Sequence, residues 1–384
     1  MKAYKKLKLF LPLVLLALQS LALDLTQINM AYVYDINSPI RLKYRLIDEE
    51  EKLALFYEVK ADSASGWATY FLSQKSYQTE VHDTLTSLSV DTLRVENRRT
   101  TVKMMFEKNQ NKELLIVSFY NPKTEYSYVY DVTINTSKDI PDFYPIDRDG
   151  LPILDPYVRA EDMNFQESDG ILHVYQYSQP FKGADPPMGQ MGPLAPTIDI
   201  DSSYMFLGSL ADITADNFYL IQRDSLSQAG VTLLKVPYYY PETKRVEELI
   251  GPLQYITTES ENKSLNSGID TKSVFERFWI NTYGTKYRAK VAIKSFYSKV
   301  EESNMLFTDY RRGWKTDRGM LYVVYGKPDE VIRTRSSEVW KYIDGPEFEF
   351  IRISTLFAPS FYSLRRNMDY ENMWYEQVGG IRKG

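Results

Sequence analysis

The chain has 384 residues, of which 46 are Lys or Arg and 51 are Asp or Glu, so its formal charge is −5. A chain of this length can bury the cores of about two or three domains, and its acidic balance argues against nucleic acid as the main partner. It contains no Cys, which excludes thiol nucleophiles, zinc–thiolate sites and iron–sulfur clusters. Its two histidines, His82 and His173, each lie in a strand-like stretch, and we interpret them as packed or surface residues.

The first 22 residues have the features of a secretory signal peptide. Four lysines precede a wholly apolar run from Leu9 to Leu18, and Ser20-Leu21-Ala22 ends the segment with small residues at its first and third positions. The run is shorter than the roughly 20 residues that span a membrane, so we predict cleavage after Ala22, with an uncleaved anchor as the alternative. Cleavage removes the four lysines and takes the formal charge from −5 to −9. The mature chain is expected to lack a transmembrane segment and to be periplasmic or associated with the outer membrane.

Residues 23–138 are predicted to form a β-sandwich domain. Runs of alternating apolar and polar residues, such as "IRLKYRLI", "TVKMMFE" and "YSYVYDVTIN", are separated by turn residues and show no helical period between them. The chain is also rich in Tyr, with 31 residues, which favours both sheets and interaction surfaces.

Residues 139–244 are predicted to form a second β-rich region with a Pro/Gly-rich insertion at 180–197. Strand patterns such as "ILHVYQYS" and "VTLLKVPYYY" flank the stretch "PFKGADPPMGQMGPLAPT". A stretch of this composition is either a linker or a loop packed on another domain. The strands of this region form a second unit or complete the first sandwich.

Residues 245–384 are predicted to form a small α+β domain. In "YRAKVAIKSFYSKVEESNMLF", five apolar residues fall on one helix face: Ala289, Ile293, Phe296, Val300 and Phe307. "KSVFERFWI" upstream predicts another helical segment, and "GMLYVVYG", "EVWKYI" and "FEFIRIS" are predicted as three short strands of an antiparallel meander. The expected fold is therefore a mostly β N-terminal region followed by helices and a meander.

Positive charge is concentrated between residues 284 and 335, where twelve Lys or Arg face six Asp or Glu. Lys286, Lys290 and Lys294 are spaced by four residues, so they share one side of the predicted helix. They are either a solvated helix side or a basic strip for an anionic partner.

The segment "RRGWKTDRGMLYVVYGKPDEV", from Arg311 to Val331, is the main candidate for a functional site. Gly313 is expected to take the positive φ of a turn after the helix, and Gly319 to let a strand begin tightly. Trp314 either covers the core or is an exposed anchor, and the short side chains of Thr316 and Asp317 suit capping. The candidate binding residues are Arg311, Arg312, Trp314, Lys315, Asp317, Arg318 and Lys327.

Three interpretations of this segment remain open. In the structural one, Asp317 and the neighbouring arginines form an ion-pair cluster on a closed turn. In the catalytic one, Asp317 works as an acid or base with Asp329 or Glu330. In the third, the same carboxylates bind Ca²⁺ or Mg²⁺, although the Asp-x-Asp-x-Asp-Gly pattern of a calcium loop is absent.

The C-terminal part resembles the GWxTD-domain family. The resemblance rests on Gly313-Trp314-Lys315-Thr316-Asp317-Arg318-Gly319, on "YGKPDE" and "EVWKY" after it, and on "FERFW" before it, within residues 245–355. It implies an exported protein of the Bacteroidota type with a β-rich N-terminal region, and it implies no established activity, ligand or catalytic residue. Family members often have two prolines where this chain has Lys327-Pro328.

Taken together, these features predict a periplasmic or envelope-associated interaction or scaffold protein. Its expected partner is an envelope protein, with an anionic glycan or lipid head group as alternatives. No cofactor or metal is predicted. The competing hypothesis is a carboxylate-dependent enzyme that acts on envelope glycans or peptides, for which two carboxyl groups about 5–10 Å apart across a cleft would be required.

Overall fold

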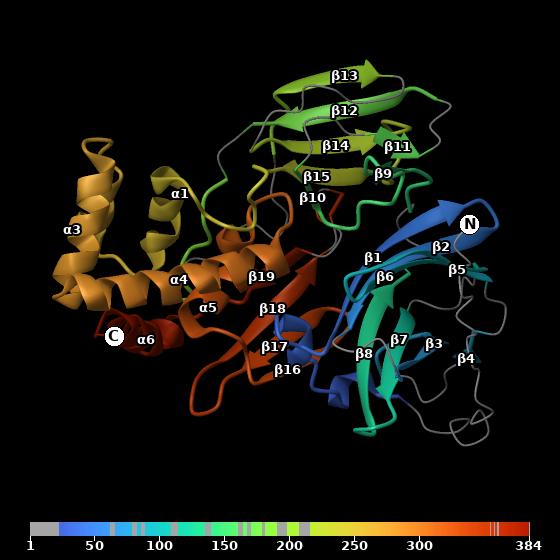
Figure 1. Cartoon of the computed structure of the whole chain (residues 1–384), viewed down its shortest axis with the longest axis horizontal. Helices are drawn as coiled ribbons and strands as arrows, with labels where there is room; N and C mark the ends of the chain where they lie inside the picture. The colour runs from blue at the N-terminus through green and yellow to red at the C-terminus, as the bar shows by residue number, and fades with distance from the viewer. Residues whose placement is uncertain are drawn as a thin grey trace, which may run out of the picture.

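The computed structural model gives the architecture of most of the chain (Figure 1). It describes residues 23–61, 66–78, 83–85, 89–108, 114–134, 140–159, 164–166, 170–178, 181–189, 198–206, 216–353, 355–356, 358 and 361–383. The predicted signal peptide and His82 lie outside these residues. Among the described residues, no helix is both long and apolar enough to cross a membrane.

Two antiparallel four-stranded sheets form the N-terminal sandwich, as predicted. The first sheet has the order β1 (Ile40–Glu49), β2 (Lys52–Ala61), β6 (Arg99–Glu107) and β5 (Ser89–Glu96). The second has the order β4 (Asp83–Thr84), β3 (Ala68–Gln74), β7 (Leu114–Asn121) and β8 (Tyr126–Thr133). Alternate side chains of the two sheets, among them Leu55, Met104 and Val117, meet in one buried core. The period of two in the sequence thus corresponds to one buried and one outer face.

A second β region follows. Five strands form a sheet in the order β10 (Tyr157–Val158), β15 (Val231–Lys235), β14 (Phe218–Gln222), β12 (Leu172–Tyr177) and β13 (Ser202–Phe206). Its β10–β15 pair is parallel and its other pairs are antiparallel. A small antiparallel pair, β9 (Tyr144–Ile146) with β11 (Asn164–Gln166), lies beside it. His173 lies on β12 and is half-buried.

The C-terminal part consists of helices followed by a meander, as predicted. The helices are α1 (Val246–Ile250), η3 (Gly251–Tyr255), α2 (Glu259–Leu265), α3 (Thr271–Tyr283), α4 (Lys286–Phe307), η4 (Gly313–Lys315) and α5 (Asp317–Tyr325). An antiparallel sheet follows, with β16 (Glu330–Arg333), β17 (Ser337–Lys341), β18 (Glu347–Ile353) and β19 (Phe361–Leu364), and the chain continues into η5 (Met368–Tyr370) and α6 (Glu371–Lys383). Four of the five residues expected on the inner face of α4 are buried and Ile293 is partly buried.

One predicted strand is wrong, because "GMLYVVYG" is the helix α5. Thr316 caps this helix: its Oγ1 accepts the N–H of Gly319 at 2.9 Å, and Asp317 occupies the first turn. The five residues from Met320 to Val324 are all buried, so the helix is apolar on every side. A short continuous apolar run of this kind does not distinguish a buried strand from a buried helix. The meander instead includes β16 and β19, neither of which was predicted from the sequence.

The N-terminal residues of the described chain pack on the C-terminal domain. Leu25 of the 3-10 helix η1 (Leu25–Gln27), Tyr34 of η2 (Ala31–Tyr34) and Met30 between the two helices belong to the same core as α4, α5 and the meander. The N–H of Met30 donates to the carbonyl of Val331 at 2.8 Å. This segment therefore links the start of the sandwich to the C-terminal meander (Figure 1).

Candidate functional site

The two glycines of the GWxTD segment are needed for close backbone approach. A Cβ on Gly313 would lie 2.7 Å from Asn304 Cα and nearer still to the carbonyl of Ser303 on α4. A Cβ on Gly319 would lie 2.6 Å from Ser303 Oγ and nearer still to the carbonyl of Gly313. Neither glycine has a positive φ, so the expectation of a left-handed turn at Gly313 and of a strand start at Gly319 is wrong. The glycines instead let η4 and α5 press against α4.

Trp314 is buried, with 7% of its surface exposed. Its carbonyl accepts the hydroxyl of Tyr255 at 2.9 Å, and its ring lies against two further glycines. A Cβ on Gly251 would be 2.8 Å from the ring, and one on Gly183 would be 3.0 Å from it. Of the two roles considered for Trp314, the structure shows the buried one.

Asp317 forms a buried ion pair with Arg366. Its Oδ1 lies 2.7 Å from Arg366 Nη2, and its Oδ2 accepts the N–H of Leu364 on β19 at 2.7 Å. Arg366 also donates to the carbonyls of Asp185 and Pro186. Residues 181–189, part of the predicted insertion, therefore pack on the C-terminal domain, and Ala184 N donates to Lys315 O at 3.0 Å. Residues 190–197 lie outside the described residues.

The other cations of the segment also have partners within the chain. Arg312 Nη2 lies 2.6 Å from Asp216 and 3.0 Å from Glu248, and Lys327 Nζ lies 2.7 Å from Asp35. The guanidinium of Arg311 lies 5.1 Å from the ring of Tyr310 and 3.6 Å from Asp309. Burial raises the pKa of Asp309 to about 6.

Lys315 is held in a different way. Its ammonium lies 5.5 Å from the Trp314 ring, and burial together with the nearby charge of Arg312 lowers its pKa to about 8.

Arg318 belongs to a buried network that joins the two ends of the fold. Its guanidinium stacks 3.8 Å from the ring of Tyr362 and donates to the hydroxyl of Tyr34 at 2.9 Å. The same hydroxyl lies 2.8 Å from both carboxylate oxygens of Glu338, to which it donates. Burial favours a raised pKa for Glu338, but the charges of Arg333 and Arg318 outweigh it and hold the pKa below its ordinary value.

Arg333 extends this network into the sandwich. It lies 2.7 Å from Glu338 within the meander and 2.6 Å from Asp131 on β8. All four charged groups are largely removed from water, so the ion pairs fix how the meander sits on the sandwich. The seven predicted site residues are thus fixed by contacts within the molecule, and their binding role stays a prediction.

A polar hollow of about 420 Å³ lies between the first sheet and residues 147–155. Its carboxylates Glu58 and Asp155 pair with Arg99 and Lys43 at 2.9 and 2.7 Å, and Glu96 pairs with Arg94. Asp147 accepts backbone N–H groups within its own turn. Within the described part of the chain, no three Asp, Glu or His side chains gather as metal ligands would. The enzyme alternative stays a prediction.

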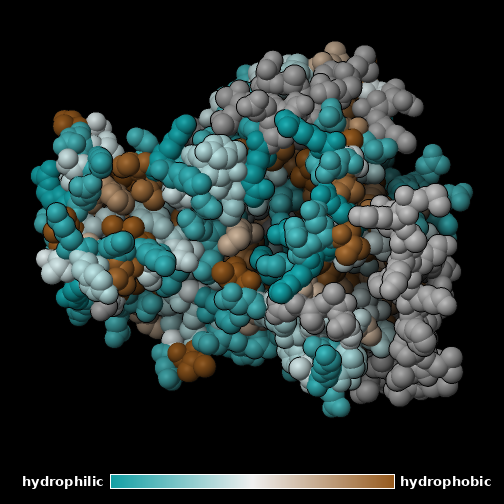
Figure 2. All heavy atoms as spheres, viewed as in Figure 1, coloured by the Kyte–Doolittle hydropathy of each residue, from teal (hydrophilic) through white to brown (hydrophobic). Residues whose placement is uncertain are grey.

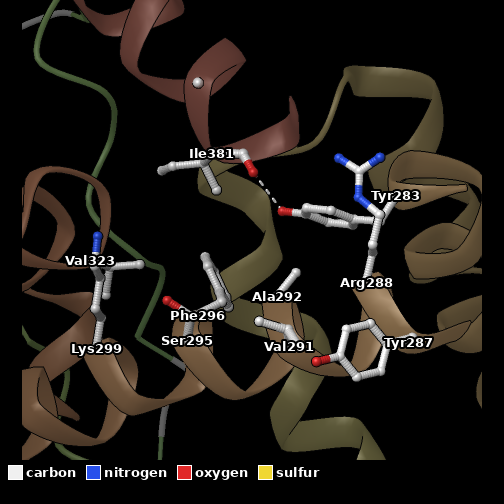
Figure 3. Close-up of a pocket in the computed structure, with 11 residues that line it drawn as sticks. Tyr283, Tyr287, Arg288, Val291, Ala292, Ser295, Phe296, Lys299, Val323 and Ile381 are labelled. Carbon is white, nitrogen blue, oxygen red and sulfur yellow. Dashed lines mark hydrogen bonds between the residues drawn. The ribbon is translucent and has the colours of Figure 1, made fainter. Parts of the chain in front are cut away.

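A second hollow, of about 380 Å³, lies beside α4 and was not predicted from the sequence (Figure 3). We call it the α4–α6 groove; it is lined by Tyr283, Tyr287, Arg288, Val291, Ala292, Ser295, Phe296, Lys299, Val323, Gly380 and Ile381. The hydroxyl of Tyr283 donates to the carbonyl of Ile381 at 2.6 Å, and Arg288 donates to Lys383 O at 2.8 Å. These bonds hold α6 against α3 and α4.

The outer side of α4 is exposed beside this groove. Lys286, Lys290 and Lys294 are exposed, and within the described residues none of the three forms an ion pair. Tyr287 and Val291 lie between them and the groove, with 77% and 54% of their surfaces exposed. Figure 2 shows brown side chains scattered among teal ones at the left end of the molecule, where Figure 1 has α3 and α4. The sequence signal for this surface was the pair Tyr287 and Val291, which are one helical turn apart and lie off the inner face of the predicted helix.

A comparison with known families matches the part of the chain that holds the motif and the C-terminal helices and meander. The model of the GWxTD domain matches residues 217–383, which confirms the resemblance and extends it from β14 to α6. Residues 217–383 are therefore similar to a GWxTD domain, and this similarity implies no activity. No curated protein matches the sequence.

Proposed function

We propose that the mature chain is an exported interaction protein of the cell envelope that binds an acidic partner protein through the outer face of α4. The observation that carries this proposal is the strip of Lys286, Lys290 and Lys294, which is exposed and lacks ion pairs among the described residues. The three ammonium groups span about 12 Å along the helix, since each residue rises about 1.5 Å.

The contrast with the GWxTD segment supports this assignment. Arg312 and Lys327 are neutralised by carboxylates of the chain itself, whereas the α4 lysines have their charge available to another molecule. An exposed cluster of like charge attracts a partner of opposite sign and speeds encounter with it. The GWxTD segment then acts as the internal framework that holds α4 in place, through Gly313 and Trp314.

Export rests on the first 22 residues, whose lysines, apolar run and small exit residues fit a cleaved signal. Fractionation of producing cells, with the N-terminal mass of the purified protein, tests this part. The proposal expects envelope or periplasmic protein that begins at Leu23. Cytoplasmic protein that keeps residues 1–22 would overturn it.

Binding is tested by affinity purification from the envelope fraction. We compare the wild type with a variant in which Lys286, Lys290 and Lys294 become Glu. The matched control changes Lys60, Lys123 and Lys272 to Glu, because these lysines are also exposed but lie elsewhere. The expected result is a stoichiometric partner that is lost in the first variant, kept in the control, and released by salt. A partner kept by both variants would contradict the proposal.

A further inference from the structure

We propose that the α4–α6 groove receives an amphipathic helical segment of the partner that carries carboxylates near both of its ends. This inference rests on the proposed function and names the chemistry of the partner. The groove is predominantly apolar, with Tyr287, Val291 and Ile381 among its lining residues. Tyr287 and Val291 separate it from the lysine strip on the other side of α4.

The size of the groove fits a short helix. Arg288 and Lys299 line it at opposite ends of the row that α4 contributes, as Figure 3 shows. They are eleven residues apart on one helix, which corresponds to about 16 Å at a rise of 1.5 Å per residue. A segment of about three helical turns therefore covers the groove, with its apolar side chains spaced three and four residues apart.

The charges of the groove select an acidic segment. Its lining includes two cations, Arg288 and Lys299, and no carboxylate. Lys299 is half-buried, and burial lowers its pKa despite the opposing effect of the Glu302 charge. A partner carboxylate would stabilise the charge of Lys299 in a place where water does so poorly.

The groove is preformed and open. Besides the Tyr283–Ile381 bond, Gln377 Nε2 donates to the carbonyl of Val324 at 3.1 Å, so α6 is fixed on α3 and α5. Gly380 lines the groove, and a Cβ built on it would meet nothing within 4 Å. Glycine destabilises a helix relative to alanine, and within the described chain no packing contact at Gly380 excludes a side chain. The free space at Gly380 therefore suits close approach by another chain.

The test uses the full mature chain and a displayed library of random peptides of about 15 residues, enough for roughly four helical turns. Gly380→Leu fills the groove. Gly379→Leu is the matched control, because it makes the same change one residue away, at a position that is outside the groove lining and also has free space. Circular dichroism melts establish that both variants fold.

We expect peptides that combine Asp or Glu with apolar residues at helical spacing, and whose affinity falls at least about tenfold with Gly380→Leu but not with Gly379→Leu. The absence of enriched peptides, enrichment without carboxylates, or equal binding to both variants would overturn the inference.

Two other occupants are distinguished by separate measurements. Flotation with vesicles of equal phosphatidylglycerol and phosphatidylcholine tests a lipid surface, and analytical ultracentrifugation tests a second copy of the chain. Membrane binding or dimerisation that Gly380→Leu abolishes would assign the groove to that occupant and contradict an acidic segment. If the lysine variant loses the envelope partner while Gly380→Leu keeps it, the proposed function stands and the groove assignment fails.

Discussion

Asp317, the acidic residue of the GWxTD motif, is paired with Arg366, which lies 49 positions later in the chain and only 2.7 Å away in space. Both side chains are almost fully buried, with 8% and 5% of their surfaces exposed. Asp317 also accepts the N–H of Leu364, and Arg366 reaches back to residues 185 and 186. One ion pair thus links the start of α5, the last strand of the meander and the segment 181–189.

Asp317→Asn should destabilise the protein strongly, because it leaves the guanidinium of Arg366 buried without its counter-charge. Loss of one member of a buried pair typically costs about 3–5 kcal/mol. The measurement is the free energy of unfolding from urea denaturation. Glu330→Gln is the control, because its pair with Lys341 is more than 40% exposed and should be worth about 0–1 kcal/mol. Equal effects of the two substitutions would contradict the structural role of Asp317.

Gly313→Ala and Gly319→Ala should each destabilise the fold by about 1–3 kcal/mol or more, because the added methyl group collides with backbone atoms that cannot easily move. Thermal melting monitored by circular dichroism measures this. Gly379→Ala should have the opposite sign: it lies in α6 with nothing within 4 Å of its Cβ, and alanine favours a helix by up to about 1 kcal/mol. A harmless Gly319→Ala would show that α5 does not pack as described.

Asp131 and Arg333 should couple the sandwich to the GWxTD domain. A double-mutant cycle with Asp131→Asn and Arg333→Gln is expected to be non-additive by about 0.5–3 kcal/mol, because both changes remove the same 2.6 Å pair. Each single change removes one charge of the pair, so the other charge stays buried without its partner and its desolvation penalty is no longer offset. The cycle for Lys103 and Glu49, a more exposed pair on the sandwich, should give less than about 1 kcal/mol. Strict additivity at Asp131 and Arg333 would argue against a coupled interface.

The docking of α6 should weaken in acid. Arg382 donates to both carboxylate oxygens of Glu261 at 2.8 Å, and this pairing lowers the pKa of Glu261 from 4.5 to about 2. Since the folded pKa is depressed, the stabilisation is fully present above pH 4.5 and is lost as the pH falls towards 2. The difference in unfolding free energy between wild type and Glu261→Gln should therefore shrink over this range. A difference that is constant with pH would contradict the ion pair.

Local patterns predicted much of the fold. Strict alternation predicted the sandwich strands, and the spacing of Ala289, Phe296 and Val300 predicted the inner face of α4, because each pattern reports the period of one element. The same rule was misleading for residues 317–325, where five successive buried residues show no period. Thr316 and Asp317 were expected to cap backbone N–H groups, and in the structure they lie at the start of α5, which Thr316 caps and where the sequence had predicted a strand.

The candidate site depended on contacts that no local pattern contains. Tyr34 donates a hydrogen bond to Glu338, 304 positions later in the sequence. Asp317 pairs with Arg366, which lies just after the meander in a stretch that no sequence motif singled out. The motif is visibly rich in charged and turn-forming residues, but the side chains that pair with those charges come from distant segments. The α4–α6 groove arises in the same way, from a helix at residue 287 and a helix at residue 380.

The most direct test of the α4 binding surface is photo-crosslinking in producing cells, with a light-activated amino acid in place of Tyr287. Tyr238, which is 79% exposed compared with 77% for Tyr287, is the matched control position. We predict a defined crosslinked partner from position 287 only, and we predict that it disappears when Lys286, Lys290 and Lys294 become Glu. Equal crosslinking from both positions, or a partner that persists after charge reversal, would contradict the claim that the outer face of α4 is the binding surface.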